Sequence, residues 1–275
     1  MALKLMYITN RPDVALVAEK YGVDRIWIDL ETLGKKERQK GLNSVKSNHT
    51  VEDIRTIKPL LSTSEVLVRI NPWHENSVQE INAVVSAGAD IIMLPMWKTV
   101  AEVTSFLSAV NGRCKTTLLL ETKEAVECLD IVLANGGMDE IHIGLNDLHL
   151  SYGMTFMFEL LANGIVEMLC KKMKEKGIPY GFGGIARLRT GDLPAENVIM
   201  EHYRLGSTRA ILSRSFCDVL KLNDIKKIKK VFADNMADLR NYEEKISVST
   251  KDEFEENRKW VVNKVKQIVE KKREK

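Results

Sequence analysis

Short apolar runs alternate with longer amphipathic stretches along the first 216 residues of the chain. The runs are rich in β-branched residues and have the length of buried strands, whereas the intervening segments repeat apolar residues at helical spacing. One intervening segment places a set of apolar residues on one helix face: Phe156, Leu160, Leu161, Ile165, Leu169 and Met173. The eight predicted strands are residues 4–10, 25–31, 65–71, 91–96, 116–122, 140–147, 179–185 and 209–216.

This alternation predicts an α/β fold, specifically a (β/α)8 TIM barrel. Strands that alternate with helices form parallel βαβ units, and continuous apolar runs such as residues 91–94 are typical of strands covered on both faces. A closed barrel typically needs about 250 residues, and the chain has 275. An open doubly wound sheet is the alternative, but no GxGxxG motif follows the first strand to favour it.

The chain divides into a barrel domain at residues 1–220 and a helical extension at residues 221–275. No linker or low-complexity segment interrupts the first part. The extension is rich in lysine and carries apolar residues at Trp260, Val261, Val265 and Ile268. Such a stripe has to be buried, so we expect the extra C-terminal helices to pack on the barrel or on a partner subunit.

Composition excludes several function classes. The net charge is +3, and the basic residues of the extension are interleaved with acids, which is typical of a solvated helix face rather than a nucleic-acid site. Four scattered cysteines show no metal-ligand spacing, as expected of reduced thiols in a cytoplasmic protein. No stretch reaches the roughly 20 apolar residues that span a bilayer, and no signal peptide is present. We therefore expect a soluble cytoplasmic protein without a membrane or nucleic-acid partner.

Polar residues follow most of the predicted strands, at the end where such barrels keep their chemistry. Charges at several strand ends are costly unless they pair with one another or bind a ligand. A structural salt-bridge network is one explanation, and a convergent polar site is the one we favour. The residues are Asn10, Asp29, Glu31, Arg69, Asn71, Glu121, Asn146, Asp147, Ser213 and Arg214.

Two of these carboxylates predict a metal site. Glu121 and Asp147 end neighbouring predicted strands and can supply hard oxygen ligands to Mg2+ or Mn2+. Arg69 offers a planar fork that suits a carboxylate or phosphate. A metal beside an arginine can chelate a 2-oxo acid and stabilise the enolate that forms when a carbon–carbon bond is made or broken. The sequence thus predicts a divalent-metal-dependent lyase or aldolase acting on an acid of the pyruvate or oxaloacetate type.

Several motifs resemble the HpcH/HpaI aldolase and citrate lyase β-subunit family of phosphoenolpyruvate/pyruvate-type barrels. They are Leu-Leu-Leu-Glu-Thr at residues 118–122, Gly-Leu-Asn-Asp-Leu at 144–148, Val-Arg-Ile-Asn at 68–71, and Gly-Ala-Asp at 88–90 with Leu-Pro at 94–95. Asp-Leu-Glu at residues 29–31 is similar to the citrate lyase branch. The resemblance covers roughly residues 20–185. It implies Glu121 and Asp147 on the metal, Arg69 on the substrate, and a homo-oligomer, usually a trimer or hexamer.

The chain departs from the aldolase branch at the general base. That branch has a histidine directly after the acidic residue that ends the second strand, whereas the chain continues with Thr32 and Leu33. Candidate replacements are Glu31, His49 and His149, alongside a metal-bound water. Together with Asp29 and Arg69, these three residues form the predicted catalytic set.

The predicted substrate-binding residues are Arg69, Asn71, Asn146, Gly183, Gly184 and Arg214. The sequence Gly-Phe-Gly-Gly at residues 181–184 belongs to the seventh strand, and loops after strands seven and eight often cradle a phosphate. Four arginines follow, at positions 187, 204, 209 and 214. The glycines indicate either a tight turn or a pocket for an anionic or sugar-like aldehyde acceptor, with Arg214 the best-placed arginine and Arg187 and Arg204 equally consistent with surface ion pairs.

Two alternative functions stay open at this point. An acyl-CoA lyase or hydrolase could use the same scaffold, because fold alone does not fix the reaction. A non-catalytic subunit that binds metal and 2-oxo acid is the other, and the missing histidine motivates it.

Overall fold

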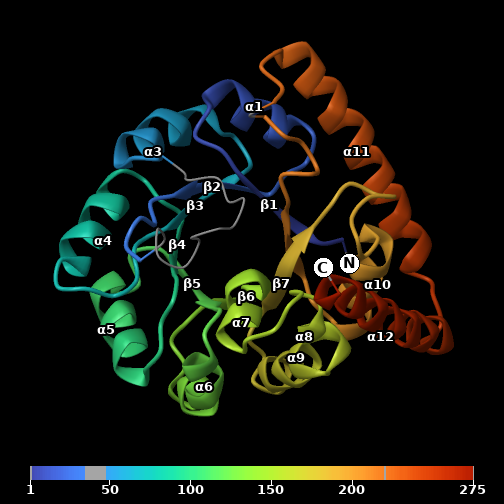
Figure 1. Cartoon of the computed structure of the whole chain (residues 1–275). Helices are drawn as coiled ribbons and strands as arrows, with labels where there is room; N and C mark the ends of the chain where they lie inside the picture. The colour runs from blue at the N-terminus through green and yellow to red at the C-terminus, as the bar shows by residue number, and fades with distance from the viewer. Residues whose placement is uncertain (1, 35–47, 220, 275) are drawn as a thin grey trace.

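Eight parallel strands close into a barrel, and helices surround it (Figure 1). The computed structural model describes residues 2–34, 48–219 and 221–274. Each strand pairs with the next along the chain, and β8 pairs with β1. The (β/α)8 prediction is confirmed. The strands are β1 (Lys4–Ile8), β2 (Arg25–Asp29), β3 (Glu65–Arg69), β4 (Ile91–Leu94), β5 (Lys115–Leu120), β6 (Glu140–Ile143), β7 (Tyr180–Ile185) and β8 (Arg209–Leu212).

Amphipathic helices cover the outside of the barrel. Helices such as α5 bury an apolar face against the strands, as the side chains of Val103, Phe106 and Val110 illustrate. Capping residues fix several helix starts, among them Thr99 before α5 and Thr122 before α6. The helices are α1 (Pro12–Lys20), α3 (Val51–Ile57), η1 (Lys58–Leu60), α4 (Ser77–Ser86), α5 (Val100–Val110), α6 (Lys123–Asn135), α7 (Leu145–Ser151), α8 (Glu159–Ala162), α9 (Ile165–Glu175), α10 (Ala195–Leu205), α11 (Ile225–Ile246) and α12 (Lys251–Arg273).

The segment from Phe156 to Met173 is two helices rather than one. Gly164 separates α8 from α9 with a φ of +84°, a left-handed conformation that an α-helix cannot contain. Leu160, Leu169 and Met173 are nevertheless buried, because the two helices present their apolar residues to the same core. Apolar spacing alone therefore predicted the buried face correctly but missed the break.

Side chains inside the barrel form layers. Strand residues alternate between the two faces of the sheet, so Arg25, Trp27 and Asp29 of β2 point inward while Ile26 and Ile28 pack outward against the helices. The middle layer is apolar and separates a charged layer at each end of the barrel. It consists of Met6, Trp27, Leu67, Ile91, Met93 and Leu119.

The lower charged layer lies at the amino-terminal ends of the strands. Arg25 donates two hydrogen bonds to Glu140, and Arg209 Nη2 lies 2.8 Å from the same carboxylate. Arg25 Nε also donates to Glu65. Arg209, one of the four arginines that follow the seventh-strand glycines in the sequence, begins β8 and lies at the opposite end of the barrel from the predicted acceptor pocket.

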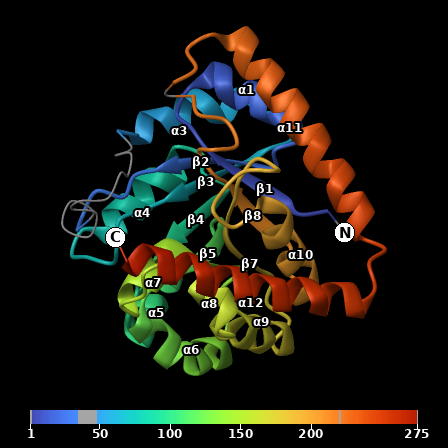
Figure 2. The same cartoon turned by 45° about the vertical axis from the view of Figure 1, so that its right-hand side comes forward.

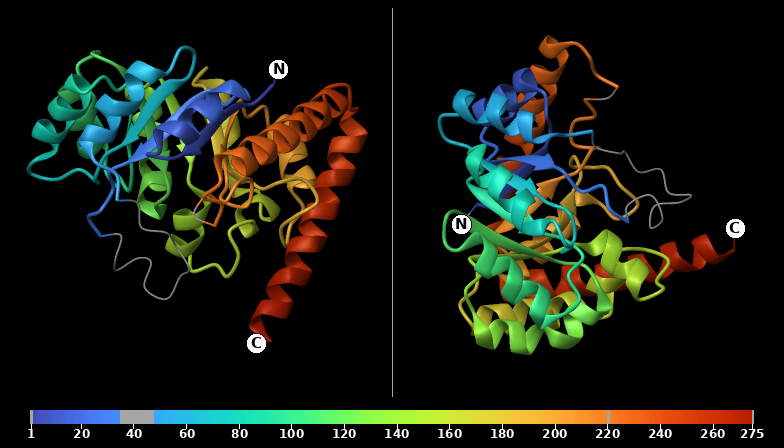
Figure 3. Two further views of the ribbon diagram at one scale, coloured as in Figure 1. Left: turned by 90° about the horizontal axis from the view of Figure 1, so that it is seen from above. Right: turned by 90° about the vertical axis from the view of Figure 1, so that its left-hand side faces the viewer.

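The two C-terminal helices pack on barrel helices. α11 lies against α1, and α12 crosses α8 and α10 (Figures 2 and 3). The buried face of α12 contains Val261, Val265 and Val269, whereas Trp260 is 42% exposed, so Trp260 is not part of the buried stripe that we predicted. No helix within the described ranges is long and apolar enough to cross a membrane.

Candidate active site

Arg69 is the last residue of β3, and two acidic residues hold its guanidinium. Its Nε and Nη2 each donate a 2.9 Å hydrogen bond to Asp29, and Nη1 lies 3.2 Å from Glu31 Oε2. The side chains of Asp29 and Glu31 are 2% exposed. Burial alone would lower the pKa of Arg69, but the negative charges of Asp29 and Glu31 outweigh it and raise this pKa, so the guanidinium stays charged.

The barrel register explains this contact. Asp29 of β2 is paired with Arg69 of β3, so both side chains enter the barrel side by side. The Trp27 ring lies below, with Arg69 Cζ 5.3 Å from its centroid, close enough for a cation–π contact. A guanidinium has five N–H donors, and the contacts with Asp29 and Glu31 occupy three of them. The remaining donors are available to an anionic ligand.

Glu121 directly follows β5 and is 3% exposed. Its Oε1 accepts a 3.1 Å hydrogen bond from the backbone N–H of Met96, after β4. Burial, and then the negative charge of Asp147, raise the pKa of Glu121 well above its ordinary value, and the positive charge of Arg69 opposes them. Glu121 is thus electrostatically coupled both to Arg69 and to Asp147.

Asn146 and Asp147 do not end a strand, contrary to our expectation. β6 stops at Ile143, and both residues lie in the first turn of α7. The apolar pattern continued past the strand because Leu145 and Leu148 of α7 are also buried. Asp147 is half-buried and an acidic residue is favourable at this helix position, whereas Asn146 is exposed.

The two candidate histidines occupy different surroundings. His49 lies at the end of β2, where its Nδ1 accepts a 2.9 Å hydrogen bond from the backbone N–H of Asp29. His149 is 7% exposed, and its Nδ1 contacts the carbonyl oxygen of Leu145 one turn earlier in α7. Because residues two apart on a helix point to different sides, His149 does not share the face of Asp147.

Asn71 connects three segments through its side-chain amide. Its Oδ1 accepts hydrogen bonds from the backbone N–H groups of Thr32 and Leu33, and its Nδ2 donates to Glu80 on α4. These contacts fix the start of the loop after β2 at the rim of the barrel. They give Asn71 a structural role beside the substrate-binding role predicted for it.

Two of the three glycines of β7 lie where neighbouring atoms leave no room for a side chain. A Cβ on Gly181 would overlap the backbone oxygen of Arg209, and one on Gly183 would lie 2.6 Å from Leu145 Cδ1. At Gly184 the nearest atom would be 3.4 Å away, which leaves ordinary contact distance. Packing therefore accounts for Gly181 and Gly183, and the acceptor pocket stays a prediction.

The arginines predicted near β7 differ in their exposure and in their partners. Arg204 forms ion pairs with Glu167 and Glu201 on the barrel surface. Arg187 and Arg214 are exposed, and Arg214 follows β8 at the carboxyl-terminal end of the strands. Arg187 likewise follows β7 by two positions, so position does not distinguish the two, and the acceptor role of Arg214 stays a prediction.

Sequence reasoning missed two residues that contact or crowd Glu121. Met96 contributes a backbone N–H, which no side-chain pattern reveals. Gly144 gives Glu121 space, because a Cβ at Gly144 would lie 2.7 Å from Glu121 Oε2. Gly144 belongs to the motif that contains Asp147, three positions later, but the sequence does not show that it contacts Glu121.

The family model described as HpcH/HpaI aldolase/citrate lyase matches residues 4–162. That match covers more than half of the chain and includes Arg69, Glu121 and Asp147. The chain belongs to this family. No curated protein matches the sequence.

Solved HpcH/HpaI family structures share the fold. An HpcH/HpaI aldolase from Desulfitobacterium hafniense DCB-2 is 17% identical with a TM-score of 0.58, covering 83% of this chain and 93% of that one. A family protein from Burkholderia cenocepacia J2315 is 12% identical with a TM-score of 0.60, covering 83% and 95%. RipC from Yersinia pestis is 16% identical with a TM-score of 0.55, covering 84% and 94%. These structures show the shared fold, and the family match supports a lyase of the HpcH/HpaI aldolase/citrate lyase type.

HpcH/HpaI family members typically depend on a divalent metal, and the donor set here fits one. Glu121 and Asp147 are two carboxylates whose mutual repulsion helps raise the pKa of Glu121, and a cation between them would relieve it. Within the described part of the chain, no three His, Cys, Asp or Glu side chains are grouped to hold a metal. A two-carboxylate site leaves the other positions to water and substrate, as Mg2+ prefers.

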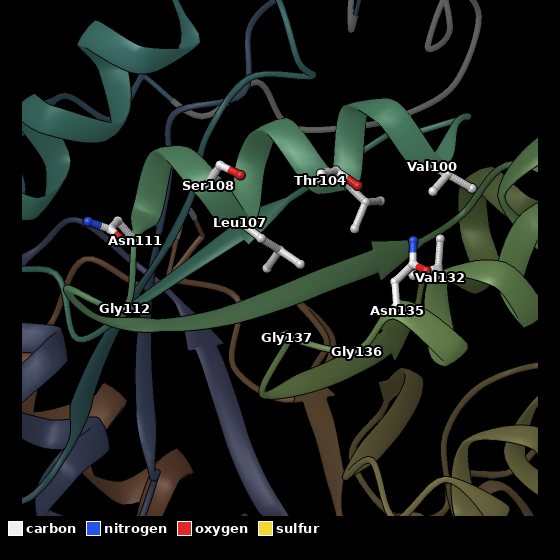
Figure 4. A pocket seen from close by; sticks show the side chains of 11 residues that line it. Val100, Thr104, Leu107, Ser108, Asn111, Gly112, Val132, Asn135, Gly136 and Gly137 are labelled. Atoms are coloured by element: carbon white, nitrogen blue, oxygen red, sulfur yellow. The ribbon is translucent and has the colours of Figure 1, made fainter.

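A separate groove of about 540 Å3 lies on the outside of the barrel between α5 and α6 (Figure 4). Val100, Thr104 and Leu107 line it from α5, and Val132 and Asn135 line it from α6. None of the residues predicted for the HpcH/HpaI site lies in it. The groove is therefore not part of the candidate active site.

Proposed function

We propose that the protein is a divalent-metal-dependent carbon–carbon lyase or aldolase that acts on a 2-oxo acid of the pyruvate or oxaloacetate type. The observation that carries this proposal is the position of Arg69, a charged and nearly buried guanidinium held by Asp29 and Glu31 and electrostatically coupled to Glu121. A 2-oxo acid has a carboxylate, which a fixed guanidinium could bind, and a keto oxygen, which a metal held by Glu121 and Asp147 could bind.

Arg69 would bind the substrate carboxylate. Its contacts with Asp29 and Glu31 fix the guanidinium plane, so little side-chain entropy is lost when a ligand binds. The Trp27 ring beneath it closes the floor of the site and excludes water. The N–H groups that Asp29 and Glu31 do not use would donate hydrogen bonds to the carboxylate of the acid.

Glu121 and Asp147 would hold the metal, which is Mg2+ or Mn2+ by the chemistry of oxygen donors. The bound ion supplies positive charge against the negative charge that develops on the keto oxygen. Glu121 is the firmer of the two ligands, because it is buried and fixed by the Met96 amide. Asp147 approaches from the first turn of α7.

Glu31 is the residue that we propose as the proton-transferring group. Asp29 takes the Nε and Nη2 donors of Arg69 in a bidentate pair, and Glu31 Oε2 lies 3.2 Å from Nη1. Glu31 is a buried carboxylate directly beside the guanidinium that would bind the substrate, and from this position it could exchange a proton with the bound acid. The Nδ1 of His49 already accepts the Asp29 amide hydrogen, which disfavours that nitrogen as a base.

Thermal denaturation with pyruvate or oxaloacetate, each with and without Mg2+ or Mn2+, tests the proposal. We expect either acid to raise the Tm of the wild type by a few degrees only when metal is present, since a ligand at 100 times its Kd adds about 2.7 kcal/mol. Glu121→Ala should abolish this shift. Glu124→Ala, an exposed glutamate on α6, is the matched control and should keep it.

Three outcomes separate the possible functions. Stabilisation without turnover of any 2-oxo acid would favour a non-catalytic binding subunit. Stabilisation by acyl-CoA compounds but by neither acid would favour the acyl-CoA lyase. No response to either acid with any divalent metal would contradict the proposed function.

A further inference from the structure

The two oxygens of the Glu121 carboxylate meet different neighbours. Oε1 accepts the hydrogen bond from Met96 N–H at 3.1 Å. Oε2 points to Gly144, where an added Cβ would lie 2.7 Å from Oε2 and 2.9 Å from Glu121 Cβ. One oxygen is thus fixed by a backbone donor, and the other occupies space that a glycine leaves open.

The Met96 donor is held in place on both sides. Met96 has a φ of +53°, a left-handed conformation that is costly for a residue other than glycine. The next residue is tied to the strand that carries Glu121, because Thr122 Oγ1 donates a 2.7 Å hydrogen bond to the Trp97 carbonyl oxygen. Surrounding structure therefore maintains a strained backbone beside a candidate functional residue, where such strain is typically found.

Gly144 is required for space and not for backbone freedom. Its φ of −82° and ψ of 86° lie outside the positive-φ region that favours glycine. Its own N–H donates to the Leu120 carbonyl oxygen at 2.9 Å, which fixes the residue against β5. It also precedes α7, whose first turn carries Asp147. Hydrogen bonds thus fix both Gly144 and Glu121, so neither residue can move away easily if a side chain is added at position 144.

We infer that Gly144 and Met96 are positioning residues that fix the Glu121 carboxylate for metal binding. The Met96 amide fixes the orientation of the carboxylate through Oε1. Gly144 gives Oε2 room beside the start of α7, whose first turn carries Asp147, so Oε2 would be the oxygen that holds a metal together with Asp147. This inference rests on the proposed function, because it assigns the geometry of that same metal site.

Mn2+ binding to the purified protein, followed by electron paramagnetic resonance of the free ion, tests the inference without an activity assay. We expect Gly144→Ala to weaken Mn2+ binding at least about tenfold, because the new methyl group displaces Oε2. Gly112→Ala is the control: its φ is +65° and no atom lies within 4 Å of the added Cβ, so it introduces backbone strain away from the site. It should lower Tm and leave Mn2+ affinity unchanged.

A second variant covers the case in which Gly144→Ala does not fold. Glu121→Asp shortens the side chain and withdraws the carboxylate from position 144. Glu121→Asp alone should weaken Mn2+ binding, and adding Gly144→Ala to it should cost less than about threefold more. Full additivity of the two changes, or wild-type affinity in Gly144→Ala, would overturn the inference while leaving the metal site intact.

Failure of the proposed function gives a different result. In that case the wild type would not bind Mn2+, or Glu121→Ala would bind it as tightly as the wild type. Either result overturns the metal site itself, and the positioning inference with it.

Discussion

At the scale of single residues, the two carboxylates that hold Arg69 contact its guanidinium in different ways. Asp29 and Arg69 form a bidentate pair, which is the stronger arrangement. Glu31 shares the same guanidinium through one 3.2 Å contact and is equally buried. Asp29 thus takes the orienting pair with Arg69, and Glu31 is the carboxylate that we propose for proton transfer.

Glu31→Gln should therefore separate proton transfer from binding. The amide has nearly the shape of the carboxylate and can still accept a hydrogen bond from Arg69, but it cannot take up a proton. We expect exchange of the pyruvate methyl protons with D2O, followed by nuclear magnetic resonance in the presence of Mg2+, to slow by about 10²- to 10⁴-fold. Stabilisation of the variant by pyruvate and metal should persist.

The control for this prediction is Glu52→Gln on α3, whose side chain is 70% exposed and pairs only with Arg55 among the residues described. It should exchange at the wild-type rate. Undiminished exchange in Glu31→Gln would contradict the assignment and direct attention to His49. Loss of both exchange and pyruvate stabilisation would show that Glu31 acts chiefly by holding Arg69.

The sequence predicted the side chains at strand ends better than the backbone groups between them. Arg69 and Glu121 follow directly from the rule that polar residues end barrel strands at the active face. The Met96 amide and the Asp29 amide that binds His49 are backbone donors, and every residue has one, so no pattern marks them. His49 contacts Asp29 from 20 positions further along the sequence, and a contact of that kind depends on the path of the chain.

At the scale of elements, strand existence was predictable and strand ends were less so. Eight apolar runs gave eight strands, because both faces of a barrel strand are covered and its apolar residues are continuous. The ends failed at β6, where buried Leu145 and Leu148 belong to the following helix α7. Asp147 was therefore assigned correctly to the mouth of the barrel and wrongly to a strand.

The break between α8 and α9 gives a test of backbone strain at this scale. Gly164 has a φ of +84°, and no atom would contact an added Cβ. Gly164→Ala should thus lower stability by about 1–2 kcal/mol through the left-handed conformation alone. Thermal denaturation should show a loss of roughly 2–8 °C.

Gly164→Asn supplies the matched comparison. Asparagine tolerates the left-handed region better than alanine does, so it should lose clearly less stability although its side chain is larger. Equal losses in the two variants would mean that the break between the helices does not depend on this conformation. A gain in the alanine variant would mean that α8 and α9 can join into the single helix that periodicity predicted.

At the scale of the whole molecule, the barrel interior holds a group of arginine and carboxylate side chains at each of its two ends. Arg69 and Glu121 lie above the apolar layer and Arg25 and Glu140 below it. Barrel enzymes carry catalysis at the carboxyl-terminal ends of the strands and stability at the amino-terminal ends. Arg209 begins β8 and therefore lies at the amino-terminal end of the barrel. Arg214, five positions later, follows β8 and lies at the carboxyl-terminal end. The role expected of each arginine therefore depends on where the strand begins and ends.

Glu140→Gln tests the stabilising layer. Glu140 accepts hydrogen bonds from Arg25 and Thr117 and forms an ion pair with Arg209, all at low exposure. Its removal leaves two buried guanidinium groups without their shared partner, and breaking a buried pair of this kind costs about 3–5 kcal/mol. We expect Tm to fall by roughly 6–20 °C, whereas the exposed Glu124→Gln should leave it nearly unchanged.

The pH dependence of this loss identifies its electrostatic origin. Burial would raise the pKa of Glu140, but the hydrogen bond and charge of Arg25 and the charge of Arg209 outweigh it and hold this pKa below its ordinary value. The ionised form therefore stabilises the fold fully above the unfolded-state pKa of about 4.3, and this contribution is lost as pH falls through the lower folded-state value. The difference in Tm between wild type and Glu140→Gln should accordingly be constant from pH 8 to 6 and shrink under more acidic conditions. A difference that persists unchanged in acid would mean that the glutamine disturbs packing, and that the lower layer stabilises the barrel by shape rather than by charge.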